Sequence, residues 1–146
     1  MSDTDEVSAY DRLVWPEGKL EQWLASGAHR RELTAFFGEA EYAKLRGMAI
    51  AAAAVKQDPR RVVWYLPGIM GTQLALPRPR PLPDNLLWLD PTDIHHGRLP
   101  LLHIPGETLI TCVPVLYTWL PLKLALNIAG YTAHCFAYDW RLDLND

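Results

Sequence analysis

The chain has little net charge, few cysteines and no long apolar run, and each scarcity excludes a class of protein. No stretch approaches the ~18 consecutive apolar residues that a transmembrane helix requires. A net charge of -3 over 146 residues offers no basic surface to nucleic acid or to an anionic membrane. The acidic N-terminus lacks the apolar core of a secretory signal. These features predict a soluble, cytoplasmic protein with no nucleic-acid partner.

Cysteine is almost missing, since only Cys112 and Cys135 occur, each in an apolar, strand-like context. A disulfide framework is therefore not expected, and we predict two buried thiols in a reducing compartment. His134 and Cys135 do not form a catalytic dyad, because neighbouring residues on a strand face opposite sides.

The composition that remains is globular, with 49% hydrophobic and 21% charged residues, and the length fits one ordinary domain. Residues 17–25, 29–37 and 39–56 repeat apolar side chains at helical spacing. The inward positions are Leu20, Trp23 and Leu24; Leu33, Phe36 and Phe37; Tyr42, Leu45, Met48 and Ala49. We predict a helical segment over residues 1–58 that carries no chemistry of its own.

A strand over residues 61–66 organises the rest of the chain. Its apolar run is β-branched and aromatic and is ended by Pro67-Gly68, which is typical of a strand buried on both faces of a parallel sheet. A second strand is predicted over residues 131–137, after a helix capped by Thr118 with Pro121 in its first turn. The fold class predicted is α/β, with a right-handed parallel strand–helix–strand crossover.

A long insertion separates that first strand from the helix. The prolines of residues 77–85 predict an extended, partly polyproline loop. One helical turn is expected over residues 93–97, after Asp90-Pro91. A hairpin is expected to join residues 101–104 and 108–113 through a turn at Pro105-Gly106.

Three short motifs stand out after the first strand. The first is Pro-Gly-x-x-Gly-Thr-x-Leu over residues 67–74, the second is Leu-Trp-Leu-Asp over 87–90, and the third is Tyr-Asp-Trp-Arg over 138–141. Together they resemble the lecithin–cholesterol acyltransferase family of α/β-hydrolases. Their order and spacing agree with the family over roughly residues 61–143. The resemblance implies that residues 59–146 are the N-terminal portion of an α/β-hydrolase domain, truncated before the nucleophile elbow.

The resemblance also implies an oxyanion hole. Ile69 takes the position of the backbone N–H donor, with Met70 as second choice, on a loop shaped by Gly68 and Gly71. Fixed donors of this kind stabilise the charge that develops on an ester carbonyl oxygen. The alternative is a strand-to-loop turn whose glycines serve packing only.

The other two segments supply a tryptophan and an ion pair. Trp88 takes the position of the family's lid tryptophan, where it would meet an acyl chain or a membrane surface; the alternative is a tryptophan packed under its own loop. Asp139 and Arg141 follow the second strand, where such a pair anchors the next loop or, as the less favoured role, contacts substrate.

Metal and cofactor chemistry find little support. His95-His96, with Asp90, Asp93 and His103 nearby in sequence, lacks a metal-ligand spacing. We expect no metal and no cofactor.

A catalytic serine is the missing part. The only serines are Ser2, Ser8 and Ser26, and none lies in Gly-x-Ser-x-Gly. The leading hypothesis is the N-terminal part of an acyltransferase or lipase that acts on lipid acyl esters, is inactive alone and needs the other half of its domain as partner. The alternative is a non-catalytic interaction module or an inactive gene fragment.

Overall fold

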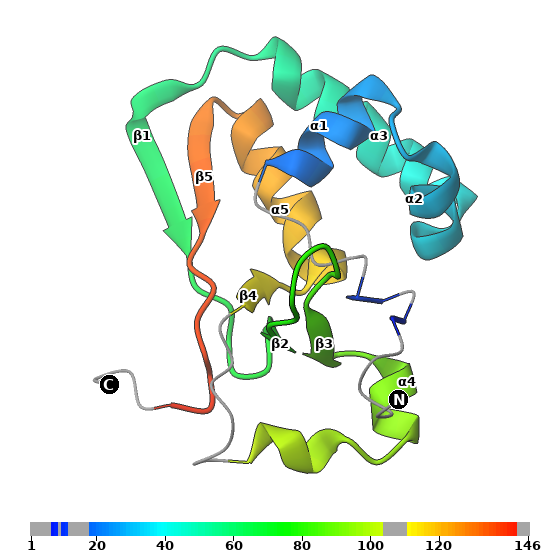
Figure 1. Cartoon of the computed structure of the whole chain (residues 1–146). Helices are drawn as coiled ribbons and strands as arrows, with labels where there is room; N and C mark the ends of the chain where they lie inside the picture. The colour runs from blue at the N-terminus through cyan, green and yellow to red at the C-terminus, as the bar shows by residue number, and fades with distance from the viewer. Residues whose placement is uncertain (1–6, 9, 12–17, 104–110, 143–146) are drawn as a thin grey trace. The chain divides into compact units, whose positions relative to one another are not determined.

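The protein forms two compact units whose segments alternate along the chain. The structure is a computed structural model that describes residues 7–8, 10–11, 18–103 and 111–142 (Figure 1). Unit 1 comprises Met1–Trp15, Pro67–Val115 and Ala137–Asp146, and unit 2 comprises Pro16–Leu66 and Leu116–Phe136. The chain is mixed α/β with a small parallel sheet, so the coarse fold class is confirmed.

Unit 2 begins with the three helices that the sequence predicts. They are α1 (Lys19–Ser26), α2 (Arg30–Phe37) and α3 (Glu39–Ala54). Gly27 and Gly38, both with positive φ, follow α1 and α2. The inward positions are confirmed in the main, because the buried apolar residues are Leu20, Leu24, Leu33, Tyr42, Leu45 and Ala49, with Ala52 in addition.

The same unit holds the parallel sheet, which consists of β1 (Asp58–Tyr65) and β5 (Tyr131–Cys135). Trp64 pairs with His134 and Tyr65 with Cys135, so the carboxyl ends of the two strands lie together. Helix α5 (Leu116–Ile128) precedes β5 and contacts both β5 and α3. Both predicted strands are therefore present and parallel.

The expectation that β1 is buried on both faces is wrong. Tyr65 on β1 and Ala133 on β5 are buried, and the Tyr65 ring stacks on Trp119 of α5 with centroids 5.6 Å apart. On the opposite face Val62, Trp64 and Leu66 are exposed, Trp64 by 59%. The run carries apolar side chains on both faces of the sheet, but helices cover only the face that carries Tyr65.

The start of α5 also differs from the prediction. The helix begins at Leu116, so Thr118 lies inside it and is not its cap. Pro121 lies in the helix interior, beyond the first turn, where proline removes one backbone hydrogen bond. The predicted stop is close, because the helix ends at Ile128 and Gly130 takes positive φ.

Unit 1 is built on a three-stranded antiparallel sheet in the order β3-β2-β4. The strands are β2 (Thr72–Leu76), β3 (Asn85–Trp88) and β4 (Thr111–Pro114). Strands β2 and β3 were not predicted. The predicted hairpin is wrong, because Leu99–Leu102 forms the 3₁₀ helix η2 and β4 pairs with β2. The turn expected at residues 105–106 and the side chain of Cys112 lie outside the described parts.

Two connections of unit 1 follow the sequence prediction. Residues 77–84, which carry four prolines, form no strand and join β2 to β3. Helix α4 (Pro91–His95) supplies the expected helical turn, and the Asp90 side chain caps it by accepting a hydrogen bond from the Thr92 N–H. Across the described residues, every helix is too short or too polar to cross a membrane.

Candidate functional site

The segment after β1 is a tight turn over residues 68–71. The Gly71 N–H donates to the Gly68 carbonyl over 2.9 Å, and Met70 takes φ +64° at the third position of the turn. A Cβ at Gly71 would lie 2.8 Å from the Pro67 Cβ and 2.9 Å from the Gly68 oxygen. Glycine is therefore required at position 71, whereas a Cβ at Gly68 would meet nothing within 4 Å.

The turn carries two backbone N–H groups and two exposed apolar side chains, those of Ile69 and Met70. Ile69 is 75% exposed and Met70 is 51% exposed. Among the described residues neither the Ile69 N–H nor the Met70 N–H donates a hydrogen bond. Adjacent N–H groups at a turn can bind an anionic oxygen, which is the property expected of these two residues.

Two tryptophans join the three segments that the sequence singled out. Trp88 donates from Nε1 to the Met70 carbonyl over 3.0 Å, and Trp140 donates from Nε1 to the Thr72 carbonyl over 2.9 Å. The two indole rings meet edge to face, with centroids 5.6 Å apart and planes at 69°. Segments 67–74, 87–90 and 138–141 therefore converge within unit 1.

Trp88 lies at the end of strand β3 and not on a loop. It packs, half-buried, on the pair of buried leucines Leu74 and Leu87, together with Trp140. Trp88 is therefore a packed tryptophan, as in the alternative to the lid role, although it packs from a strand and not from a loop. Its indole nevertheless fixes the carbonyl of Met70 and so positions the turn that carries the two donors.

Asp139 and Arg141 form a bidentate ion pair after β5. The Arg141 Nε donates to Asp139 Oδ1 over 2.8 Å, and its Nη1 donates to the Leu102 carbonyl over 3.2 Å. The side-chain hydrogen bond from Arg141 lowers the pKa of Asp139 below its usual value, against a smaller effect of burial. The pair thus ties residues 139–141 to η2, which is the anchoring role predicted for it.

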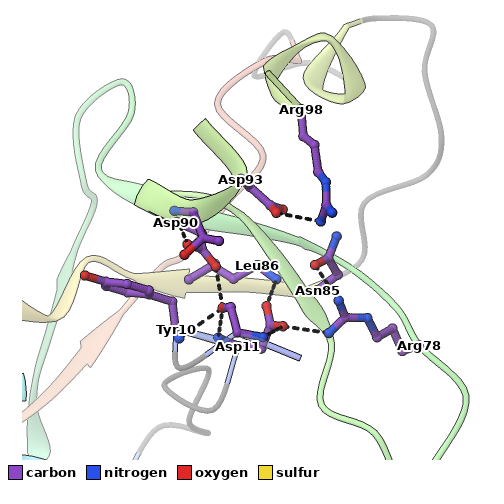
Figure 2. A network of polar contacts seen from close by, with 10 residues as sticks. Tyr10, Asp11, Arg78, Asn85, Leu86, Asp90, Asp93 and Arg98 are labelled. Carbon is purple, nitrogen blue, oxygen red and sulfur yellow. Dashed lines mark hydrogen bonds and ion pairs between the residues drawn. The ribbon is translucent and has the colours of Figure 1, made fainter. Parts of the chain in front are cut away.

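Unit 1 also contains a buried polar network that the sequence did not indicate (Figure 2). Asp11, fully buried, accepts from the Leu86 N–H over 2.8 Å and pairs with Arg78 over 2.7 Å. Ser8 donates its hydroxyl to Asp90. A short N-terminal segment is thereby fixed to β3 and to the start of α4.

Asp93 is the third carboxyl group of this network. It pairs with Arg98 over 2.8 Å, and its Oδ2 is buried without a hydrogen-bond partner among the described residues. Burial raises the pKa of Asp93, and the nearby carboxylates Asp90 and Asp11 add to the rise. The Asp90-Pro91 signal marks only the helix start, and nothing in the sequence around Asp11 marks it as buried.

The remaining candidates are not brought together. His95, His96 and His103 are exposed, and the described residues contain no group of three side chains suited to a metal ion. Ser8 is engaged with Asp90, and Ser26 is exposed at the end of α1. Cys135 is half-buried on β5, and its neighbour His134 stacks on Trp64.

Comparison of the chain with models of protein families, with curated proteins and with solved structures finds no match.

Proposed function

We propose that the chain is the N-terminal part of an acyltransferase or lipase of the lecithin–cholesterol acyltransferase type, acting on lipid acyl esters. The observation that carries the proposal is the convergence of the three resembling segments. Trp88 and Trp140 contact each other and bind the backbone on either side of Gly71. Contact at a single turn is what a shared role in one site would require.

In this function the turn would bind the developing oxyanion. An ester carbonyl oxygen gains negative charge as the carbonyl carbon becomes tetrahedral, and the N–H groups of Ile69 and Met70 would stabilise that charge. The exposed side chains of the same two residues would contact the acyl chain. Trp88 would position the donors through its bond to the Met70 carbonyl, and Gly68 and Gly71 would keep the turn compact.

Turnover would require a nucleophile from another polypeptide segment. The serines of this chain lie at positions 2, 8 and 26, and among the described ones Ser8 binds Asp90 and Ser26 has no histidine bonded to it. This observation favours the second candidate, a non-catalytic interaction module, for the 146 residues alone. The remaining half of a hydrolase domain would be the partner that restores activity.

A soluble alkylphosphonate tests the anion site directly. Its charged oxygens mimic the tetrahedral oxyanion, so titration should move the amide resonances of Ile69 and Met70 in ¹H–¹⁵N spectra. Ile69→Pro removes one donor at a turn position that proline favours, and it should weaken binding by about tenfold or more. Ile69→Ala keeps the N–H and loses only the side-chain contact with the alkyl group, so it should bind more tightly than Ile69→Pro.

Two outcomes would refute the donor role. Equal binding by the Pro and Ala variants would show that the N–H at position 69 is not used. Absence of any shift at residues 69 and 70 would show that the turn is a packing feature.

A second test separates the enzyme from the interaction module. The genomic DNA beyond codon 146, read in all frames for about 100 codons, should encode Gly-x-Ser-x-Gly between a strand and a helix. The 146-residue chain alone should show no turnover of a short acyl ester. Serine-dependent turnover by this chain would contradict our assignment, and absence of the motif in every frame would favour the interaction module.

A further inference from the structure

Residues 7–8 and 10–11 are attached to the outer strand of the antiparallel sheet in unit 1 (Figure 2). That strand is β3, since the order of the described sheet is β3-β2-β4. The Leu86 N–H of β3 donates to Asp11 Oδ1 over 2.8 Å, and Arg78 donates to Asp11 Oδ2 over 2.7 Å. We call residues 7–8 and 10–11 the N-terminal strap.

Ser8 joins the strap to itself and to the start of α4. Its hydroxyl oxygen accepts from the Tyr10 N–H over 3.0 Å and from the Asp11 N–H over 3.1 Å, and the hydroxyl donates to Asp90. The strap is therefore attached to the rest of unit 1 through two buried carboxylates, those of Asp11 and Asp90.

Asp93 on α4 adds a third buried carboxyl group to this region. Its Oδ1 accepts from Arg98 over 2.8 Å, whereas its Oδ2 is buried without a hydrogen-bond partner among the described residues. An ionised oxygen in that position lacks a donor, but a protonated one can itself donate a hydrogen bond. The other titratable groups of α4 and its end, His95 and His96, are exposed. The site therefore suits the neutral acid better than the carboxylate.

The charges that surround the strap balance when Asp93 is protonated. Asp11 and Asp90 are then matched by Arg78 and Arg98, and ionisation of Asp93 adds one negative charge in excess. Burial raises the pKa of Asp93 against the effect of Arg98, and the Asp90 and Asp11 carboxylates add to the rise. Release of the strap would remove Asp11 and admit water, so the released form would bind its proton less tightly. Rising pH should therefore favour release.

We propose that the N-terminal strap is a pH-dependent element, bound to β3 and α4 while Asp93 carries a proton and released more often once Asp93 is ionised. Release would free the Leu86 N–H on the strand that also carries Trp88. The inference rests on the polar network of unit 1 and not on the proposed acyl-transfer function.

Hydrogen exchange of the Leu86 amide in the full chain measures opening of the strap. Its protection, followed by NMR and corrected for the intrinsic exchange rate, should fall about threefold or more between about pH 4 and 7. The Val115 amide, which donates to the Gly71 carbonyl in the same unit, should not follow this fall. Asp93→Asn is neutral at every pH and keeps an acceptor for Arg98, so the fall should disappear in this variant.

Two further variants identify the source of the signal. Ser8→Ala removes the bond from the strap to Asp90, so it should lower the protection of Leu86 at every pH and leave that of Val115 unchanged. Glu41→Gln neutralises an exposed carboxylate of unit 2 and should leave the Leu86 profile as in the unchanged chain. The Leu86-to-Val115 comparison in the unchanged chain tests the proposal even if Asp93→Asn does not fold.

Three results would overturn the proposal. A Leu86 profile with the same pH dependence in Asp93→Asn and in the unchanged chain would show that Asp93 does not control the strap. Parallel changes at Leu86 and Val115 would show that unit 1 opens as a whole. Unchanged protection of Leu86 in Ser8→Ala would show that the bond to Asp90 does not hold the strap.

Discussion

The pKa values of two aspartates in unit 1 are shifted in opposite directions. Asp139 receives hydrogen bonds from Arg141, which favour its charged form and lower its pKa. Asp93 is buried near Asp90 and Asp11, which disfavours its charged form and raises its pKa despite the Arg98 pair. The two residues should therefore contribute oppositely to the pH dependence of stability.

Asp139→Asn and Asp93→Asn should separate these contributions. The lowered pKa of Asp139 gives stability above pH 3.8 that is lost as pH falls through the folded value, so Asp139→Asn should cost about 1–3 kcal/mol at pH 7 and less in acid. The raised pKa of Asp93 has the opposite effect on the pH dependence of stability. Stability of the unchanged chain relative to Asp93→Asn should fall as pH rises from 3.8 through the folded pKa.

Urea unfolding of the three proteins between pH 3 and 7 measures both effects. The Asn side chain keeps an acceptor for Arg98 or Arg141, so the shape of each site is preserved. Parallel pH profiles for the two variants would contradict the opposite shifts.

Asp11 should be the most sensitive carboxyl group of the network. Its removal in Asp11→Ala would leave Arg78, whose side chain is 7% exposed, without that carboxylate, and the Leu86 N–H without its acceptor. We expect a loss of about 3–5 kcal/mol in the free energy of unfolding. Glu41→Ala, which removes the exposed pair with Lys44, should change it by less than about 1 kcal/mol.

Chemical denaturation followed by tryptophan fluorescence measures this difference. Similar midpoints for the two variants would mean that the N-terminal segment is not fixed to β3.

At the scale of elements, the turn after β1 offers a matched pair of glycines. Gly71→Ala should destabilise unit 1 by about 1–3 kcal/mol, because the added Cβ meets the Pro67 side chain and the Gly68 carbonyl at contact distances below 3 Å. Gly68→Ala meets nothing and should be close to neutral. Urea denaturation of both variants checks the prediction, and equal midpoints would contradict it.

Elements with a strong period were predictable from the sequence. Helices α1, α2 and α3 carry apolar residues at helical spacing and glycines after the first two, and β1 ends in the β-branched and aromatic run of residues 62–65. Strand β2 was missed because its five residues, TQLAL, follow a glycine turn and precede prolines, so the local sequence favours a loop. Its partners β3 and β4 decide its conformation.

The site was also predictable only in part, because some of its contacts join residues far apart in the sequence. The turn residues and Trp88 stand out by residue type, and the bond from Trp88 to the Met70 carbonyl joins them. The burial of Asp11 comes from Arg78 and Leu86, which lie 67 and 75 residues away along the chain. No local pattern encodes a contact of that separation.

At the scale of the whole molecule, the exposed apolar residues of the β1–β5 sheet and its ends should govern behaviour in solution. These residues are Val62, Trp64, Leu66 and Phe136. Four exposed apolar side chains lie on a two-stranded sheet, and sheets of two strands are marginally stable. We expect the chain alone to aggregate on heating without a cooperative transition. Light scattering during a thermal ramp should fall for the double variant Val62→Thr, Trp64→Thr, and a cooperative transition of a monomeric chain would contradict the expectation.

The alternation of the two units along the chain also determines what a chain break would do. The backbone passes from unit 2 to unit 1 at Leu66–Pro67 and returns at Val115–Leu116, and β1 pairs with β5 across that whole excursion. A single cut between residues 77 and 84 would therefore leave each unit assembled from both pieces. The two fragments should co-purify after cleavage, held by strand pairing and packed helices in place of the peptide bond.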